Sequence, residues 1–109
     1  MEARLWVAQR ATAVVLAFCV LVHLATIIYA VRGGLSAAEI LARTRGSVAW
    51  GLFYSTFVIA AAVHGSIGLR HIGAEWLGLR GKASIAVMHV VALALAVLGL
   101  RAVFAVVVS

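Results

Sequence analysis

Four histidines of this chain lie in or beside long runs of apolar residues. They are His23, His64, His71 and His89. Ionisable side chains at membrane depth are rare, and they usually face the interior of a helix bundle. An imidazole in that setting can ligate a metal, carry a proton or form a hydrogen bond between helices. The residues around each histidine therefore have to decide between these roles.

His64 stands among small residues. Gly65 is adjacent, Gly68 follows one turn later on the same helix face, and Ala60 and Ala61 lie one turn earlier. Small residues at this spacing allow another helix to approach closely. They also leave the flat space that a porphyrin needs beside an axial imidazole. His64 is therefore a candidate haem b ligand, with a plain interhelical hydrogen bond as the alternative.

The other histidines are less specific. His23 lies near the middle of the first apolar run, on a face that it shares with Thr12, Cys19 and Thr26. His71 follows Arg70 and reads as an interfacial residue.

His89 comes seven residues after Lys82, which predicts about the same depth as His64. An intrachain pair of His64 and His89 is therefore compatible with the spacing. A second haem ligand from another chain is favoured over this pair, because no glycine lies near His89. For His89 itself a packing role is preferred.

Arg10 and Arg70 stand at the inner ends of the first two predicted helices, toward the same membrane surface. Cations there anchor helices by reaching to the membrane surface. If a haem hangs from His64, its propionates would point toward this surface, where an arginine would pair with them. A quinone carbonyl could find a donor at the same corner.

The composition places these residues in a membrane protein. The chain has 109 residues, of which 66% are hydrophobic, and it has no proline. Soluble domains are about half apolar, so a polar surface cannot cover this chain. The net charge of +6 sits at the ends of apolar runs, which indicates membrane topology and not a nucleic-acid partner.

Three runs are long enough to cross a lipid bilayer as helices: residues 11–31, 48–69 and 83–107. Only helices satisfy their own backbone in lipid, so the predicted fold is an all-α bundle of three transmembrane helices in one domain, 1–109. The first run is expected to remain as a span and not to be cleaved as a signal peptide. Ser36 is the expected N-cap of a short turn between the first two spans. The connection that begins at residue 70 joins the second span to the third.

The positive charges favour one orientation. The side with the N-terminus and the 70–82 connection carries Arg4, Arg10, Arg70, Arg80 and Lys82, against three or four arginines on the other side. Positive residues are enriched in cytoplasmic loops, so the N-terminus is expected on the cytoplasmic side.

The segment His64-x-x-x-Gly68-Leu69-Arg70-His71-Ile72 resembles a family signature. It is similar to the His-x-x-x-Gly-hydrophobic-Arg-His-hydrophobic pattern of the cytochrome b membrane-anchor subunit of succinate dehydrogenase. The family pattern continues with an aromatic residue and Asp, where this chain has Ala74 and Glu75. The resemblance implies that His64 is an axial ligand of haem b.

The segment "QRATAVVLAFCVLVHL" (9–24) resembles the first helix of the dihaem cytochrome b of fumarate reductase. This implies that His23 could serve a second haem nearer the opposite membrane face. Those dihaem proteins have five helices in one chain. The remaining ligands would therefore come from a second haem-ligating membrane-anchor subunit, against which this bundle is expected to pack.

The resemblance also implies partners and a quinone site. Arg10 corresponds to the arginine near the haem propionate and quinone, but Trp6 replaces the family's serine four residues earlier. A flavoprotein subunit and an iron–sulfur subunit would dock on the N-terminal side. Electrons would then pass between the iron–sulfur clusters and a quinone substrate. The expected location is a bacterial inner (cytoplasmic) membrane, and the chain alone would be a subunit and not a complete enzyme.

Two other function classes remain open. One is a haem-free membrane adaptor, whose histidines only form bonds between helices. The other is a small transport or proton-conducting subunit that uses His23 and His64 as relay groups. Glu39, in the connection between the first two spans, is a candidate proton acceptor.

Overall fold

The computed structural model describes residues 3–108, which fold into four α-helices. They are α1 (Ala3–Arg32), α2 (Ala37–Thr44), α3 (Val48–Trp76) and α4 (Gly81–Val107). α1, α3 and α4 are each long and apolar enough to cross a membrane. The predicted all-α bundle of three transmembrane helices is confirmed.

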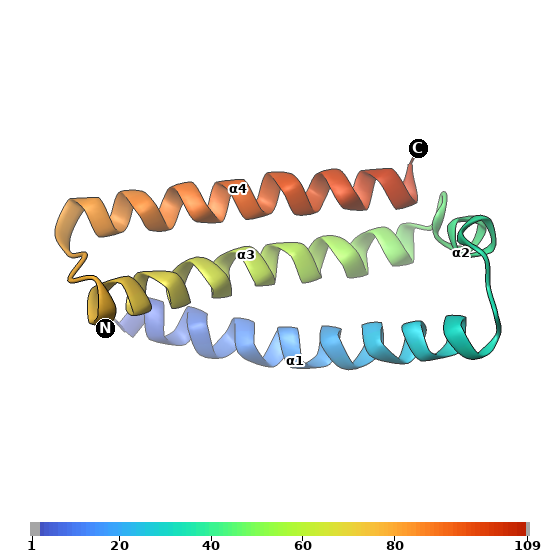
Figure 1. Cartoon of the computed structure of the whole chain (residues 1–109), viewed down its shortest axis with the longest axis horizontal. Coiled ribbons are helices and arrows are strands. Elements are labelled where there is room, and N and C mark those ends of the chain that lie inside the picture. Colours follow the sequence, from blue (N-terminus) through green and yellow to red (C-terminus); the bar gives the residue numbers. More distant parts are fainter. Residues whose placement is uncertain (1–2, 109) are drawn as a thin grey trace.

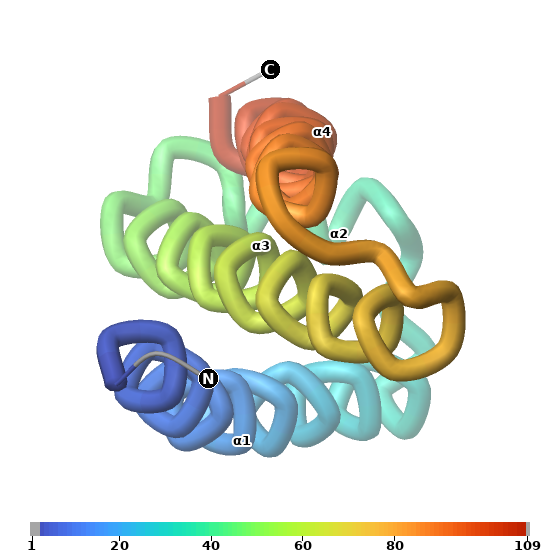
Figure 2. Tube along the Cα trace, turned by 90° about the vertical axis from the view of Figure 1, so that its left-hand side faces the viewer, coloured from blue at the N-terminus to red at the C-terminus, as the bar shows by residue number. Residues whose placement is uncertain are grey.

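α3 is the central helix of the bundle. It lies between α1 and α4 and packs against both (Figure 1), and the end-on view shows the three long helices stacked in that order (Figure 2). Successive long helices are antiparallel. One end of the bundle therefore holds the start of α1 and the connection between α3 and α4, and the other end holds α2.

The helices extend beyond the predicted spans. α1 begins at Ala3, before the predicted start at residue 11. α3 runs to Trp76, beyond the predicted end at residue 69. An apolar run stops at the first arginine, but no proline interrupts the backbone there, so the helix continues into the membrane interface. α3 ends only where Gly78 adopts a φ of 67°. The sequence had indicated that Arg10 and Arg70 lie at helix ends. In the structure both lie within helices.

α2 has the predicted cap. Ser36 Oγ accepts the backbone N–H of Glu39 at 3.2 Å, and Glu39 Oε1 accepts the backbone N–H of Ser36 at 3.1 Å. These two bonds form a capping box. The hydrogen bond from the Ser36 backbone lowers the pKa of Glu39. The charged form is therefore stabilised, which makes Glu39 a poorer proton acceptor than its position in the sequence suggested.

Two hydrogen bonds attach α2 and the following loop to the last turn of α4. The Thr44 hydroxyl donates to the Val106 carbonyl at 2.7 Å, and the Gly46 backbone N–H donates to the Val107 carbonyl, also at 2.7 Å. Carbonyls in the last turn of a helix have no partner within that helix. These bonds therefore give two of the last carbonyls of α4 a partner, and they fix the position of α2.

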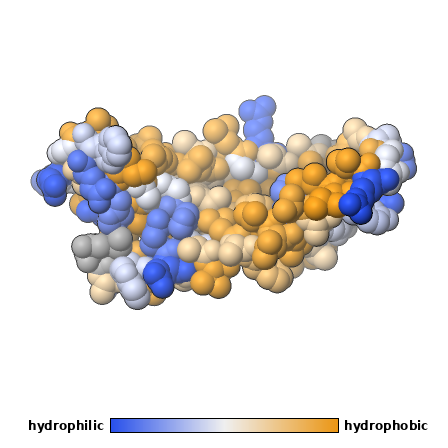
Figure 3. All heavy atoms as spheres, turned by 60° about the horizontal axis from the view of Figure 1, so that its bottom comes forward, coloured by the Kyte–Doolittle hydropathy of each residue, from blue (hydrophilic) through white to orange (hydrophobic). Residues whose placement is uncertain are grey.

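A glycine allows a close approach between two of the long helices, α3 and α4. A Cβ added at Gly99 of α4 would lie 2.9 Å from Val58 Cγ2 of α3, so the glycine is needed for this close approach. The outer surfaces of α1 and α4 are largely uncovered. Figure 3 shows a hydrophobic region between more hydrophilic ends, as a bilayer requires.

Candidate functional site

One face of α1 carries its polar side chains toward α3. They are spaced by three, four or seven residues and are all at least partly buried: Gln9, Thr12, Cys19, His23 and Thr26. This periodicity keeps them on a single helix face. The predicted polar face of the first span is therefore the surface that packs on the central helix.

His64 of α3 is held by Thr12 of α1. Thr12 Oγ1 lies 3.2 Å from His64 Nδ1 and 2.7 Å from the Ala8 carbonyl oxygen. A hydroxyl has one proton, and the carbonyl can only accept, so this proton goes to Ala8. Thr12 must then accept a proton from Nδ1, which leaves the lone pair on Nε2. The ring is thus set to use Nε2 as a metal ligand or hydrogen-bond acceptor.

Gly68 lies one turn beyond His64, and its missing side chain faces α1. The Gln9 amide nitrogen is 3.6 Å from the place where a Cβ would stand. Gln9 Oε1 is buried and has no hydrogen-bond partner within residues 3–108. The space that the sequence predicts beside Gly68 is therefore bordered by an amide whose oxygen lacks a donor.

Arg10 and Arg70 lie toward the same end of the bundle as this cluster. Arg70 is half-buried on α3. Arg10 is exposed, and its guanidinium carbon lies 5.4 Å from the centre of the Trp6 ring. That geometry is a cation–π contact, so the tryptophan at the position of the family's serine packs against the arginine.

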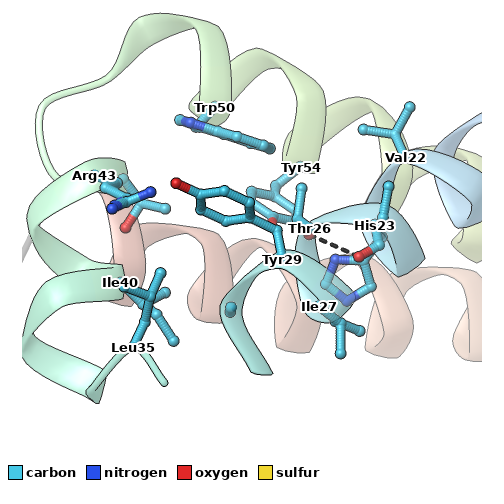
Figure 4. Close-up of a pocket in the computed structure, with 13 residues that line it drawn as sticks. Val22, His23, Thr26, Ile27, Tyr29, Leu35, Ile40, Arg43, Trp50 and Tyr54 are labelled. Carbon is cyan, nitrogen blue, oxygen red and sulfur yellow. Dashed lines mark hydrogen bonds between the residues drawn. The ribbon is translucent and has the colours of Figure 1, made fainter. Parts of the chain in front are cut away.

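His23 lies farther along α1, toward α2. Its ring contacts the edges of Tyr54 and Phe57, each with a centroid distance of 5.8 Å. His23 Nδ1 is buried without a hydrogen-bond partner in the part of the chain that the structure describes. Two cavities, of about 710 and 470 Å³, meet at this side chain. Figure 4 shows the larger one, with His23 at one end of it.

His89 does not pair with His64. It is exposed on α4, and its Nδ1 donates to the Ile85 carbonyl at 2.9 Å. Gly65, next to His64, lies opposite Leu95. His89 is six residues before Leu95, or about 9 Å along the axis. The depth inferred from Arg70 and Lys82 is wrong, because α3 continues past Arg70 and α4 begins before Lys82.

The sequence did not reveal that Thr12 and Gln9 belong with His64 and Gly68. The sequence did contain a signal for this pairing, since Thr12 lies two residues after Arg10 and His64 lies six residues before Arg70. In an antiparallel pair of spans these positions meet near one membrane surface. Within residues 3–108, no group of three or more His, Cys, Asp or Glu side chains is placed to hold a metal ion. A haem iron needs only one or two axial side chains.

Comparison with known protein families decides the identity. The sequence model of the succinate dehydrogenase/fumarate reductase transmembrane subunit matches residues 1–108. The chain belongs to this family. Neither the curated proteins nor the solved structures compared with it include a significant match. As a member of the succinate dehydrogenase/fumarate reductase transmembrane subunits, it is an integral membrane protein that partners with other subunits.

Proposed function

We propose that this subunit binds haem b through His64 and passes electrons between the iron–sulfur subunit and a membrane quinone. The observation that carries the proposal is the hydrogen bond between His64 Nδ1 and Thr12. It fixes the tautomer in which Nε2 can ligate iron, and ligating histidines in proteins commonly have such a partner.

Each neighbouring residue has a role in this proposal. Gly68 places no side chain of its own beside His64, where the Gln9 amide lies, and Arg10 and Arg70 pair with the haem propionates or with a quinone carbonyl. The unpartnered carbonyl of Gln9 fits the need for a donor from a bound group or a partner chain. When bound, haem supplies a one-electron carrier. The residues of this chain orient the ligand ring and neutralise the propionate charge.

The partners follow from the same assignment. The second axial ligand comes from a second haem-ligating anchor subunit, because His89 lies away from His64. The flavoprotein and iron–sulfur subunits dock at the end that holds the start of α1 and the α3–α4 connection. We place that end on the cytoplasmic side of a bacterial inner membrane.

The test is the haem content of the complex purified with its partner subunits. His64→Ala should remove one haem, measured as pyridine haemochrome and as the b-type band in the reduced-minus-oxidised spectrum. His89→Ala removes an exposed histidine of α4 and should retain full haem content. Unchanged haem in the His64→Ala complex would refute the assignment. A wild-type complex without the band would favour the haem-free adaptor, in which the Thr12–His64 bond only joins two helices.

His23 is a candidate ligand for a second haem. The supporting observation is its buried, unpartnered Nδ1 between two cavities. The same haem assay on His23→Ala decides the number of haems. A fall from two haems to one supports the dihaem form, and a single haem that survives the substitution limits the subunit to His64. Proton flux through His23 in a haem-free protein would instead support the proton-conducting class.

A further inference from the structure

The larger cavity has an apolar interior and a cation at its mouth. Its volume is about 710 Å³, and it lies between the second half of α1, α2 and the start of α3. This size is within the range of ligand-binding cavities. Figure 4 shows Arg43 and the Tyr29 hydroxyl together at the end opposite His23.

Arg43 has donors to spare. Its guanidinium carbon lies 5.3 Å from the centre of the Tyr29 ring, and Figure 4 shows the Tyr29 hydroxyl beside the guanidinium. A guanidinium has five N–H donors. One oxygen atom cannot use all of them, and Arg43 is exposed. The remaining donors are therefore available to an anion at the mouth of the cavity.

The charge around the mouth also favours an anion. Arg32 and Arg43 lie at this end of the described chain, and Glu39 is the acidic residue between them in the sequence. The Glu39 carboxylate already accepts the Ser36 backbone N–H. Two arginines against one carboxylate leave an excess of positive charge at this end of the part of the chain that the structure describes.

The walls place the mouth at the level of lipid headgroups. Trp50 stacks on Tyr54 with a centroid distance of 5.6 Å, and aromatic residues of this kind gather at membrane interfaces. Ile27 and Tyr29, which also line the cavity, are 44% and 61% exposed, so this side opens toward the bilayer. The cavity follows α1 from Tyr29 to Val22. These residues are seven positions apart, which is a rise of about 10 Å along the helix into the membrane.

We propose that this cavity binds one acidic glycerophospholipid. The phosphate lies on the free donors of Arg43, beside the Tyr29 hydroxyl, and one acyl chain follows the apolar wall of α1 toward His23. Arginine pairs with phosphate through charge-assisted hydrogen bonds, and basic pockets between membrane helices suit anionic headgroups. The proposal does not depend on the haem assignment of His64, and it is an alternative to a second haem at His23 as the occupant of this cavity.

The test uses the purified whole complex in detergent. After delipidation, native mass spectrometry measures binding of dioleoyl phosphatidylglycerol, with dioleoyl phosphatidylcholine and inorganic phosphate as comparison ligands. The wild type should bind one phosphatidylglycerol, at least about tenfold more tightly than phosphatidylcholine, and should not retain phosphate. Arg43→Gln should abolish this preference. Arg32→Gln removes the same charge at the same end from a residue that does not line the cavity, and it should keep the preference.

A second variant guards against misfolding of Arg43→Gln. Ala25 lines the cavity and is exposed, so Ala25→Phe should fill the acyl path and reduce binding of both lipids while leaving Arg43 in place. Equal affinity of the wild type for the two lipids would overturn the proposal. So would loss of haem from Arg43→Gln without a change in lipid binding, because the cavity would then belong to the cofactor. A partner subunit that seals the cavity would appear as no lipid bound in any variant, and this result also overturns it.

Discussion

Thr12 affects His64 through the proton on the imidazole Nδ1. Because its own hydrogen goes to the Ala8 carbonyl, the hydroxyl can only accept from the imidazole. A partner that accepts from the distal nitrogen makes the other nitrogen a stronger electron donor. At the residue scale, the α1–α3 contact therefore sets the electronic character of the proposed ligand as well as its orientation.

Thr12→Val tests this effect with little change in shape. Loss of the acceptor should make Nε2 less basic and raise the midpoint potential of the haem by roughly 20 to 60 mV. This is the one-electron equivalent of a hydrogen bond of about 0.5 to 1.5 kcal/mol. Redox titration of the b-type band measures it. Thr26→Val is the control, since within residues 3–108 that hydroxyl donates to the His23 backbone carbonyl and not to an imidazole. A potential that is equal in Thr12→Val and the wild type would show that Thr12 does not tune the ring.

Close approach of two backbones governs packing at the scale of helices. α3 and α4 meet where Gly99 faces Val58, a β-branched residue with a restricted χ1 angle. The valine cannot easily turn aside, so the missing side chain at Gly99 allows the contact. At Gly51 an added Cβ would lie 3.5 Å from Val107 Cγ1, an ordinary van der Waals distance.

Gly99→Ala should therefore destabilise the complex by about 1 to 3 kcal/mol through overpacking. The midpoint of thermal denaturation in detergent should fall, and Val58→Ala in the same chain should restore most of it. Gly51→Ala is the matched control on the same interface, and it should be neutral or slightly stabilising because alanine favours helix. An unchanged midpoint of thermal denaturation in Gly99→Ala would mean that α3 and α4 separate easily at the Gly99–Val58 contact.

The α2 cap should depend on pH. The lowered pKa of Glu39 means that its contribution to stability is present above the ordinary value of 4.5 and is lost as pH falls through the lower folded value. Hydrogen-exchange protection of α2 amides should therefore decrease in that acidic range. Glu39→Gln keeps a capping side chain without a charge, so its protection should not change with pH. The N-cap of α3, where Ser47 accepts the Trp50 N–H, lacks a carboxylate and is an internal control; a parallel loss there would indicate general acid unfolding.

The whole molecule has a largely hydrophobic middle between two more hydrophilic ends (Figure 3). The uncovered outer faces of α1 and α4 must be covered by lipid or partner subunits, because the three spans bury few of their residues within this chain. The end with Arg4, Arg10 and the α3–α4 connection carries more positive residues than the α2 end. The excess predicts a cytoplasmic location for that end.

Cysteine labelling in membrane vesicles tests this topology. In a Cys19→Ala background, Leu77→Cys in the α3–α4 connection should react with an impermeant maleimide only in inverted vesicles. Ala38→Cys in α2 should react only in right-side-out vesicles. Both sites are exposed at opposite ends of the bundle. The reverse pattern would invert the orientation, and labelling of both cysteines from one side would contradict the three-span topology.

The features that the sequence predicts correctly are those set by local chemistry. Hydropathy locates the three spans, and Ser36 marks the start of α2. The register between helices is different, because it depends on how particular surfaces fit, as at Gly99 and Val58. This is why the pairing of Thr12 with His64 was missed and why His89 was placed at the wrong depth.

The attachment of α2 to α4 also has a consequence for synthesis. Thr44 and its acceptor Val106 are 62 positions apart in the chain. Ribosomes add about 5 to 20 residues per second, so roughly 3 to 12 s pass between the translation of the two. During that interval α1 and α3 can enter the membrane as a hairpin while α2 has no fixed place. Docking of α2 thus reports that the third span has been completed.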